Sequence, residues 1–460
     1  MRFTRRLLDR RAAGLAAVLC WSATVVATAS CSSSERGQAR FDSEDASREP
    51  APASDATADA GTDADVTVHD AGPIDASARP VECTTAPCAV SLDTTFIATS
   101  DTRREGFCAL LADGTVACWG TNAGGELGDG DDAGGSDSVT PLRVPGLSNI
   151  VKLAHTCAID KDGASWCWGT GPFDPAEGDA AAPITVARTP VKLAIPSATA
   201  IDMSPTVICA LTGGEILCWG KNATGQVAPY ETAPWIARVA AQPMALPAGA
   251  PVRDLAVGAA TFALRDDGTV VSWGANPPLG RVSPLSPDPY PAPIVIRDVT
   301  DIDVARTDAC AVSNGTGYCW GPQTDPGYSA GRLVRALPAP VVTPEPITRI
   351  ATTPTLTTSS YGTIHPEPYR WCAVGISGAA YCWGSNDSGQ AGDGKTDYAW
   401  DAVKVKGLPD PVAQIKTTLE ATCALLTTGK IYCWGSNFYG QLGNGKVKQP
   451  SLVPQEVVLP

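Results

Sequence analysis

Cysteines recur along this chain in pairs at a short, nearly constant spacing. In six segments two cysteines lie nine or ten positions apart and are followed by Trp-Gly, as in CALLADGTVACWG at residues 108–120. Two cysteines at such a spacing form a disulfide, remain as thiols, or bind a metal ion. The motif Cys-x-x-Cys, which is typical of zinc sites, does not occur in the sequence.

A seventh segment helps to choose among these three possibilities. FALRDDGTVVSWG at 262–274 has Phe262 and Ser272 at the two cysteine positions, so both cysteines are missing together. This is expected when two sulfurs need only each other, whereas a metal site shared between segments would not lose its ligands in pairs. We therefore favour disulfides, with reduced buried thiols and metal ligation as the alternatives. The expected pairs are Cys108–Cys118, Cys157–Cys167, Cys209–Cys218, Cys310–Cys319, Cys372–Cys382, Cys423–Cys433 and, before the first segment, Cys83–Cys88.

A β-hairpin is the element that would position each pair. In the two segments with the shorter spacing, the midpoint is a two-residue turn, Gly213-Gly214 or Asn314-Gly315, of the type I′ kind. In the other five segments the loop has three residues and ends in a glycine, where a left-handed conformation is needed: Gly114, Gly163, Gly268, Gly378 and Gly429. The longer loop keeps the two cysteine positions opposite each other, on a non-hydrogen-bonded rung with Cα atoms about 4.5 Å apart.

The seven hairpins recur with a period near fifty residues. The second cysteine position falls at 118, 167, 218, 272, 319, 382 and 433, so the steps are 49, 51, 54, 47, 63 and 51 residues. A β-rich unit of this length predicts an all-β fold, a seven-bladed propeller with four-stranded blades over residues 83–460. The last segment, PSLVPQEVVLP at 450–460, has no hairpin after it, and we expect it to complete the first blade and close the ring.

A second phrase follows several of the tryptophans and carries a family resemblance. WGTNAGGELGDG at 119–130, WGSNDSGQAGDG at 383–394 and WGSNFYGQLGNG at 434–445 resemble the repeats of the regulator of chromosome condensation family. The resemblance covers about residues 90–460 and implies a seven-bladed β-propeller. It also implies that the repeated glycines and tryptophans, and His155, pack between blades. The nuclear exchange activity that gave the family its name is not expected of an exported, acidic chain.

The N-terminal part of the chain predicts export. Several arginines precede an apolar stretch that ends in small residues, which is typical of a signal peptide at 1–30. TASC at 28–31 resembles a bacterial lipoprotein cleavage box, so Cys31 is the expected lipid attachment site, with ordinary cleavage or an uncleaved anchor as alternatives. Residues 31–82 are rich in Ser, Ala, Asp and Pro and predict a disordered acidic tether. We expect a protein held at the outer envelope or cell surface, or secreted, in an oxidising compartment.

Few residues are available for catalysis. The chain has 3 histidines, and it contains no Gly-x-Ser-x-Gly, His-x-x-x-His or phosphate-binding loop. An aspartate-rich stretch at 128–137 resembles a calcium loop, but Ala133 and Thr140 stand at ligand positions, so a solvated turn is expected. We predict no catalytic residue, no metal site and no cofactor. A net charge of −14 argues against nucleic-acid binding. We expect a monomer that contacts a membrane only through its lipid.

A binding scaffold for an unknown protein or extracellular ligand is the leading function. An enzyme that uses loop residues on the propeller face, or a secreted inhibitor of an enzyme such as a β-lactamase, are the alternatives. The longest step between hairpins reflects an insertion at 352–371, which contains Tyr361, His365, Tyr369 and Trp371. Aromatic residues on long loops are frequent in interfaces. We expect the insertion either to form the binding face beside the channel mouth or to cover its own blade.

Overall fold

The computed structural model describes residues 77–95, 106–130, 135–176, 178, 185–233, 238–324, 332–354, 356–360, 363–367 and 370–460. The chain divides into two units, Met1–His69 and Asp70–Pro460, and the described residues all belong to the second unit. The predicted signal peptide at 1–30, the lipid site at Cys31 and most of the tether at 31–82 therefore lie outside the described residues. Within the described part of the chain, no helix is both long and apolar enough to span a membrane.

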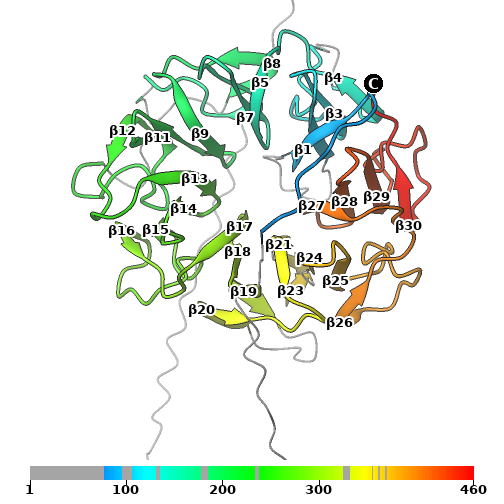
Figure 1. Ribbon diagram of the computed structural model, residues 1–460. Helices are drawn as coiled ribbons and strands as arrows, with labels where there is room; N and C mark the ends of the chain where they lie inside the picture. The colour runs from blue at the N-terminus through cyan, green and yellow to red at the C-terminus, as the bar shows by residue number, and fades with distance from the viewer. Residues whose placement is uncertain are drawn as a thin grey trace, which may run out of the picture. The chain divides into compact units, whose positions relative to one another are not determined.

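Seven four-stranded antiparallel sheets are arranged as blades around a central channel (Figure 1). In each blade the first strand lies at the channel and the last strand lies at the circumference of the ring, as Figure 1 shows. The prediction of an all-β propeller with seven four-stranded blades is therefore confirmed. Blade 6 carries an additional two-stranded hairpin, inserted after its first strand.

The strand bounds follow the chain from blade to blade. Blade 1 contains β1 (Ala89–Thr94), β2 (Gly106–Leu111), β3 (Val116–Gly120) and β4 (Ser138–Arg143). Blade 2 contains β5 (Ile150–Ala154), β6 (Cys157–Asp160), β7 (Ser165–Gly171) and β8 (Thr185–Lys192). Blade 3 contains β9 (Ala198–Met203), β10 (Val207–Thr212), β11 (Glu215–Lys221) and β12 (Arg238–Met244). Blade 4 contains β13 (Val252–Val257), β14 (Ala260–Arg265), β15 (Val270–Gly274) and β16 (Asp288–Pro293).

The remaining blades follow the same order. Blade 5 contains β17 (Val299–Ala305), β18 (Asp308–Ser313), β19 (Thr316–Thr324) and β20 (Arg332–Pro340). Blade 6 contains β21 (Ile347–Thr352), β24 (Arg370–Gly375), β25 (Ala380–Gly384) and β26 (Ala399–Lys404), with the inserted strands β22 (Leu356–Ser360) and β23 (Thr363–Glu367). Blade 7 contains β27 (Val412–Thr417), β28 (Ala421–Leu426), β29 (Ile431–Gly435) and β30 (Ser451–Glu456).

The second and third strands of each blade form the predicted hairpins, and the cysteines face each other across them. Cys108 pairs with Cys118 in the strand register, as Cys372 does with Cys382. Across the six hairpins the two Cα atoms are 4.1–4.2 Å apart and the two sulfurs 1.99–2.12 Å apart, which is disulfide distance. In blade 4, Phe262 stands opposite Ser272 and both are fully buried.

Two features at the ends of the hairpins also follow from the sequence. Gly114 in the first three-residue loop has a φ of 76°, the left-handed conformation that only glycine adopts without strain. Cys83 and Cys88 have Cα atoms 5.8 Å apart and their sulfurs also lie at disulfide distance. The peptide N–H of Ala89, directly after this small loop, donates to the carbonyl of Gly429 in blade 7. The loop is thereby held against the last blade.

One tryptophan per hairpin connects most blades to the preceding blade. The indole N–H of Trp168 donates to the carbonyl of Glu126 at 2.9 Å, and that of Trp434 donates to the carbonyl of Gln390 at 2.8 Å. Trp219, Trp273 and Trp320 make the same contact to the blade before their own. These five indoles are fully buried. The packing role that the family resemblance implies for the tryptophans is therefore present in the structure.

The predicted strand exchange at the ring closure is wrong. The segment at 450–460 forms β30, which pairs with β29 and so completes blade 7 rather than blade 1. Blade 1 is complete without it, because β1 precedes the first cysteine hairpin and pairs with β2. The first strands gave no clear sequence signal because polar residues such as Asp93 and Asp202 interrupt their apolar positions. The ends of the described part do lie close together, since Val81 and Leu459 pack against the same cluster of buried residues.

Candidate functional site

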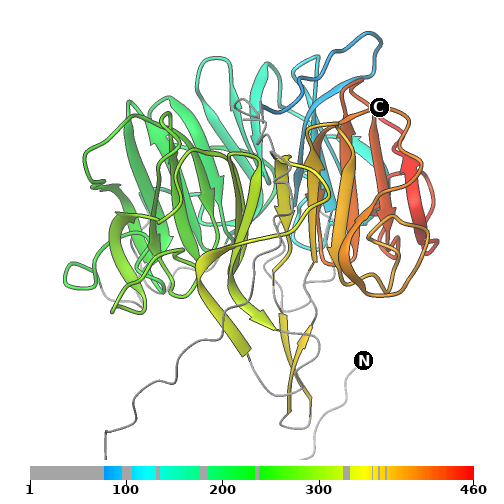
Figure 2. The ribbon, with the colours of Figure 1, turned by 60° about the horizontal axis from the view of Figure 1, so that its bottom comes forward.

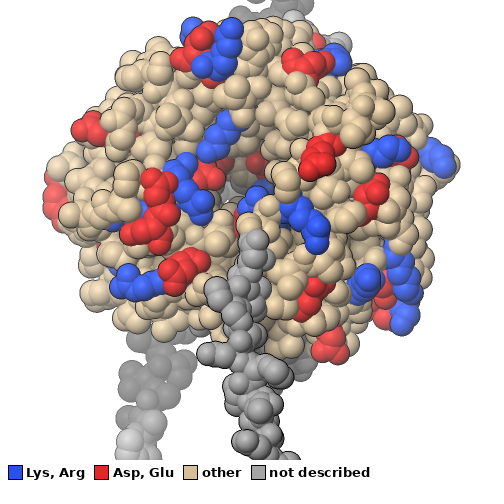
Figure 3. All heavy atoms as spheres, in the orientation of Figure 1, with Lys and Arg blue, Asp and Glu red and all other residues tan. Residues whose placement is uncertain are grey.

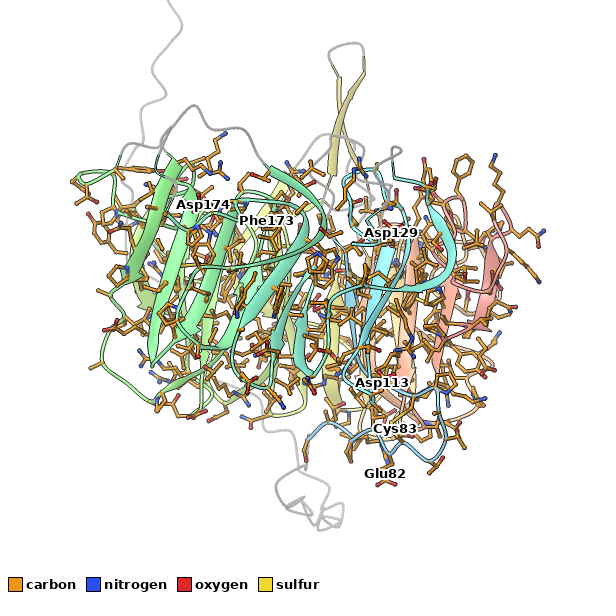
Figure 4. All side chains as sticks on the ribbon, turned by 90° about the horizontal axis from the view of Figure 1, so that it is seen from above. Glu82, Cys83, Asp113, Asp129, Phe173 and Asp174 are labelled. Carbon is orange, nitrogen blue, oxygen red and sulfur yellow. A yellow bond between two sulfur atoms is a disulfide. The ribbon has the colours of Figure 1, made fainter. Side chains whose placement is uncertain are left out.

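The insertion in blade 6 forms a β-hairpin that extends beyond one face of the ring. β22 and β23 pair antiparallel, with Thr358 opposite His365 in the register. Figure 2 shows the two yellow strands projecting from the ring. In Figure 4 they rise from the face near which Asp129, Phe173 and Asp174 lie, whereas Glu82, Cys83 and Asp113 lie at the other face. We name the face with β22 and β23 the insertion face.

A buried arginine anchors the base of this insertion. Arg370 is completely buried, and its guanidinium donates to the carbonyls of Gln390 and Ala421 at 3.1 and 2.8 Å. It also contacts the hydroxyl of Thr422 and the carbonyl of Thr418, both in blade 7. The backbone of Arg370 closes the base, because its N–H donates to the hydroxyl of Thr353 at 3.0 Å. The inserted hairpin therefore starts and ends on a rigid support between blades 6 and 7.

The four residues proposed from sequence for binding have different positions. Tyr361 and Tyr369 lie outside the described residues, and the backbone of His365 lies in β23. Trp371 lies in β24, half-buried, and its ring stacks on Trp383 with centroids 6.0 Å apart and an angle of 25° between the planes. Trp371 thus packs on a tryptophan of its own blade.

Four other aromatic residues in blades 6 and 7 were not identified from the sequence. Tyr398 and Trp400 have ring centroids 4.7 Å apart, and Trp400 is 67% exposed. Phe438 and Tyr439 form a similar pair at 4.8 Å, and Phe438 is 52% exposed. We name these residues the aromatic pairs. Phe438 and Tyr439 belong to the repeated phrase after the tryptophan, where the phrases at 119–130 and 383–394 have Ala-Gly and Asp-Ser, and that difference was a usable signal.

The channel opens into a cavity beside the insertion. The cavity has a volume of about 330 Å³, and its lining includes Thr352 and Pro354, which directly precede β22. His155, Asp303 and Lys416 also line it. Most hydroxyl groups at its wall are already engaged, as for Thr94, which contacts the His155 ring at 3.2 Å. The insertion therefore starts beside the mouth of the channel, which is one of the two positions that the sequence predicts for it.

Five ionisable side chains, acidic and basic in turn, form a row across the channel. We name them the channel chain: Asp202, His155, Asp93, Lys416 and Asp303. Lys416 Nζ lies 3.3 Å from Asp93 Oδ1 and 2.9 Å from Asp303 Oδ1. His155 Nδ1 lies 3.8 Å from Asp93 Oδ1, and its Nε2 lies 3.6 Å from Asp202 Oδ1. The chain joins blades 1, 2, 3, 5 and 7 through side chains alone.

Each aspartate of the channel chain also binds the backbone of the next blade. Asp93 accepts a hydrogen bond from the N–H of His155 at 3.2 Å, and Asp202 accepts one from Val257 at 2.7 Å. Asp303 accepts one from Thr352 at 2.9 Å. The first strand of a blade has an unpaired edge on the channel side, and these carboxylates satisfy some of its donors. The arrangement is that of a structural clasp between neighbouring blades.

Burial and neighbouring charges set the protonation of this chain. Burial raises the pKa of Asp202 to about 6, partly opposed by His155. Burial would also raise the pKa of Asp93, but Lys416 and His155 hold that pKa below its usual value. Burial alone would lower the pKa of Lys416, because it disfavours the charged ammonium. The negative charges of Asp303 and Asp93 outweigh this effect, so the pKa of Lys416 is raised. A usable sequence signal was present but overlooked: Asp202, Asp303 and Lys416 each lie seven residues before a first cysteine.

The opposite opening of the channel is lined by paired charges. Lys152 lies 2.7 Å from Asp254, and Arg349 lies 2.7 Å from Asp301. Figure 3 shows basic and acidic side chains interspersed around the central depression of that face. Among the residues that the structure describes, no group of three or more His, Cys, Asp or Glu is placed to hold a metal ion. The channel charges are therefore mainly partners for one another.

Comparisons with known proteins agree with this architecture. Two family profiles, both described as "Regulator of chromosome condensation (RCC1) repeat", match residues 412–441 and 428–460. The human E3 ubiquitin-protein ligase HERC2 is 25% identical over 75% of this chain, and the Arabidopsis thaliana ultraviolet-B receptor UVR8 is 26% identical over 73%. This chain spans 6% of the length of HERC2 and 64% of that of UVR8.

A solved structure shares the fold. Yeast RCC1 (Prp20), in a crystal structure bound to Kap60, superimposes with a TM-score of 0.60 and 19% identity. The similarity covers 75% of this chain and 84% of the yeast chain. The seven repeats, their inter-blade tryptophans and the matches to the repeat profiles lead to one assignment. Residues 412–460 carry the regulator of chromosome condensation (RCC1) repeat, and the described residues share the propeller fold of yeast RCC1.

Proposed function

We propose that this protein is an exported, lipid-anchored scaffold that binds a partner protein through the insertion face of its propeller. The observation that carries the proposal is the β22–β23 hairpin, which extends from a rigid base at Arg370 beside the channel mouth. A protruding element on a rigid scaffold is a common site of recognition. The yeast relative in the comparison was solved bound to another protein, Kap60, which supports protein binding as the function.

The chemistry of blades 6 and 7 supports the same conclusion. Trp400 and Phe438 are more than half exposed, and large exposed aromatic residues are enriched among the residues that contribute most to binding energy. The channel chain, in contrast, is engaged in contacts between blades, so it offers little to a catalytic mechanism. A binding scaffold is therefore favoured over an enzyme that uses loop residues. A secreted inhibitor of an enzyme would be one form of such a scaffold, with the enzyme as its partner.

Export and anchoring rest on two observations. Seven cysteine pairs at disulfide distance are consistent with an oxidising compartment. The signal segment at 1–30 and Cys31 then provide the route and the lipid site. If this is correct, the chain will incorporate radiolabelled palmitate and sediment with membranes, and Cys31→Ser will abolish both. Unchanged membrane association of the Cys31→Ser variant would contradict the lipid anchor without affecting the binding proposal.

Affinity capture tests the binding face. The full chain, kept without reducing agent, is used to capture partners from an envelope extract, and the captured protein is then titrated against variants. We expect Tyr361→Ala with Tyr369→Ala to weaken capture by about tenfold or more, because aromatic anchors dominate such interfaces. Tyr290→Ala serves as the matched control, since Tyr290 is an exposed tyrosine of blade 4, 46% exposed. If the double variant captures the partner as well as the Tyr290→Ala control and the unmodified chain do, the insertion is excluded as the binding site.

A further inference from the structure

The outermost strand of blade 6 differs from those of the other six blades in the backbone N–H groups that it can offer at its outer edge. An outermost strand has an unpaired edge, to which another chain can add a strand. The structure shows which residues of that strand point their backbone outward. Cys372 and Cys382 form a close, non-hydrogen-bonded pair with Cα atoms 4.1 Å apart, so the N–H and C=O of Cys382 point toward β26. Its partner Val403 therefore points its own N–H and C=O inward.

The alternation of the strand then assigns the outward positions. Val405 points inward as well, because its N–H donates to the carbonyl of Ala380 at 2.9 Å. The residues between and beside these two, Ala402 and Lys404, point their backbone N–H away from the sheet. The same register holds in blade 1, where Leu142 pairs with Cys118 and Arg143 with Ala117. The two outward positions can therefore be compared across all seven blades.

Six blades have proline at one or both outward positions. At the position of Ala402 these are Pro141, Pro190, Pro291, Pro338 and Pro454. At the position of Lys404 they are Pro243, Pro293 and Pro340. Proline has no N–H to donate, so it prevents an added strand from pairing at that point. Only blade 6 has an N–H at both positions.

We propose that β26 accepts an extended segment of the partner protein as a fifth strand of blade 6. The proposal rests on the proposed function and adds a second contact for the same partner, at the circumference of blade 6. Trp400 is 67% exposed at the start of this strand and provides an aromatic anchor beside the free edge. Lys404 is exposed at its other end. A segment with an apolar residue near Trp400 and a carboxylate near Lys404 fits both side chains, and strand addition supplies the backbone hydrogen bonds.

The other blades indicate which substitutions in β26 test the strand addition without disturbing the fold. Ala402→Pro introduces the residue that blades 1, 2, 4, 5 and 7 have at the same position, so the variant is expected to fold with an unchanged melting temperature. Lys404→Pro is a second variant with the same logic, because blades 3, 4 and 5 have proline at that position. Ala402→Val is the matched control, because it changes the side chain and keeps the N–H.

The probe is a library of random linear peptides displayed on phage, selected against the oxidised full chain. We expect enriched peptides with an acidic residue, whose affinity falls about tenfold on Ala402→Pro and on Lys404→Pro but not on Ala402→Val. This corresponds to the loss of one or two backbone hydrogen bonds. In the complex, the amide protons of Ala402 and Lys404 should be protected from exchange.

Three outcomes would overturn the strand addition. The first is that no peptide is enriched, and the second is that peptides bind Ala402→Pro as well as the unmodified chain. The third is that the unmodified chain forms dimers that Ala402→Pro abolishes, which would assign the edge to a second copy. If the captured partner is lost with Tyr361→Ala and Tyr369→Ala but retained by Ala402→Pro, the proposed function stands and the edge of blade 6 is not its site.

Discussion

The indole N–H of Trp119 in blade 1 donates to the backbone carbonyl of Gln441 in blade 7, at 2.9 Å and across 322 positions of sequence. The same contact joins Trp168 to Glu126 and Trp219 to Pro172, each in the preceding blade. The ring is therefore closed by the same interaction that joins its neighbouring blades. No strand is exchanged between the first and the last blade in the described part of the chain.

This contact predicts the effect of a substitution at the closure. Trp119→Phe removes the donor and leaves the buried carbonyl of Gln441 unpaired, so it should lower the free energy of unfolding by about 2 kcal/mol. Trp219→Phe, which removes the same contact inside the ring, should have a similar effect. Chemical denaturation of both variants measures this. A much larger loss for Trp119→Phe would mean that the closure is weaker than the other junctions.

The cysteine pairs predict a defined disulfide map. Because the two cysteines of each hairpin stand opposite each other in the register, peptide mapping of the unreduced protein should find Cys108 with Cys118 and the others likewise. Replacing both by alanine should lower the free energy of unfolding by about 2–3 kcal/mol, since each bridge closes a short loop. Cys108→Ala alone should make Cys118 reactive toward thiol reagents after unfolding. Free thiols at most of these positions in the native protein would contradict the map.

A buried carboxyl in blade 1 predicts a pH dependence of stability. Glu126 is fully buried, and burial raises its pKa to about 7 from an ordinary 4.5. Its Oε2 accepts the N–H of Gly124 at 2.8 Å, as the amide oxygens of Gln390 and Gln441 accept corresponding N–H groups in blades 6 and 7. The protonated acid therefore resembles the glutamine of the other repeats.

The raised pKa of Glu126 determines whether stability rises or falls with pH. The stability associated with protonated Glu126 is present below about pH 4.5 and is lost as the pH rises through about 7. Above that pH the unmodified chain should be less stable than Glu126→Gln by roughly 3 kcal/mol, and below pH 4.5 the two should be equal. Gln390→Glu should introduce the same dependence into blade 6. The melting temperatures of Glu126→Gln and of the unmodified chain are measured across this pH range. A difference between them that does not change with pH would refute the raised pKa of Glu126.

A substitution of Lys416 measures how much the channel chain contributes to the free energy of unfolding. Lys416→Met removes the cation between Asp93 and Asp303 and leaves two largely buried carboxylates, which should lower the free energy of unfolding by roughly 2–3 kcal/mol. The low pKa of Asp93 depends on Lys416, so this loss should shrink in acid, where Asp93 becomes protonated in both proteins. Lys430→Met is the control, because Lys430 pairs with Glu456 at the exposed surface. An equal, small effect of both substitutions would show that the channel chain is not a stabilising clasp.

The sequence by itself determined the features that depend on local chemistry. The glycine at the turn and the count between two cysteines define a hairpin, because loop length sets which residues face each other. Repetition of the hairpin then implied the number of blades, since one unit cannot bury its apolar faces alone. For these reasons the fold class, the cysteine pairs and the inter-blade tryptophans were predictable from residues such as Gly114, Cys108 and Trp119.

The tertiary structure alone decided what depends on distant neighbours. Asp202, His155 and Lys416 come from three blades. The equal offset of Asp202 and Lys416 from a first cysteine marks a common position in the repeat, but only the closed ring brings the three side chains into one channel. The role of β30 was mispredicted because a polar first strand such as β1 gives a weak signal, whereas pairing partners are chosen by the geometry of the whole ring. The prolines of the outer strands were visible in the sequence, but only the strand register revealed that Ala402 and Lys404 occupy the positions that proline blocks in the other six blades.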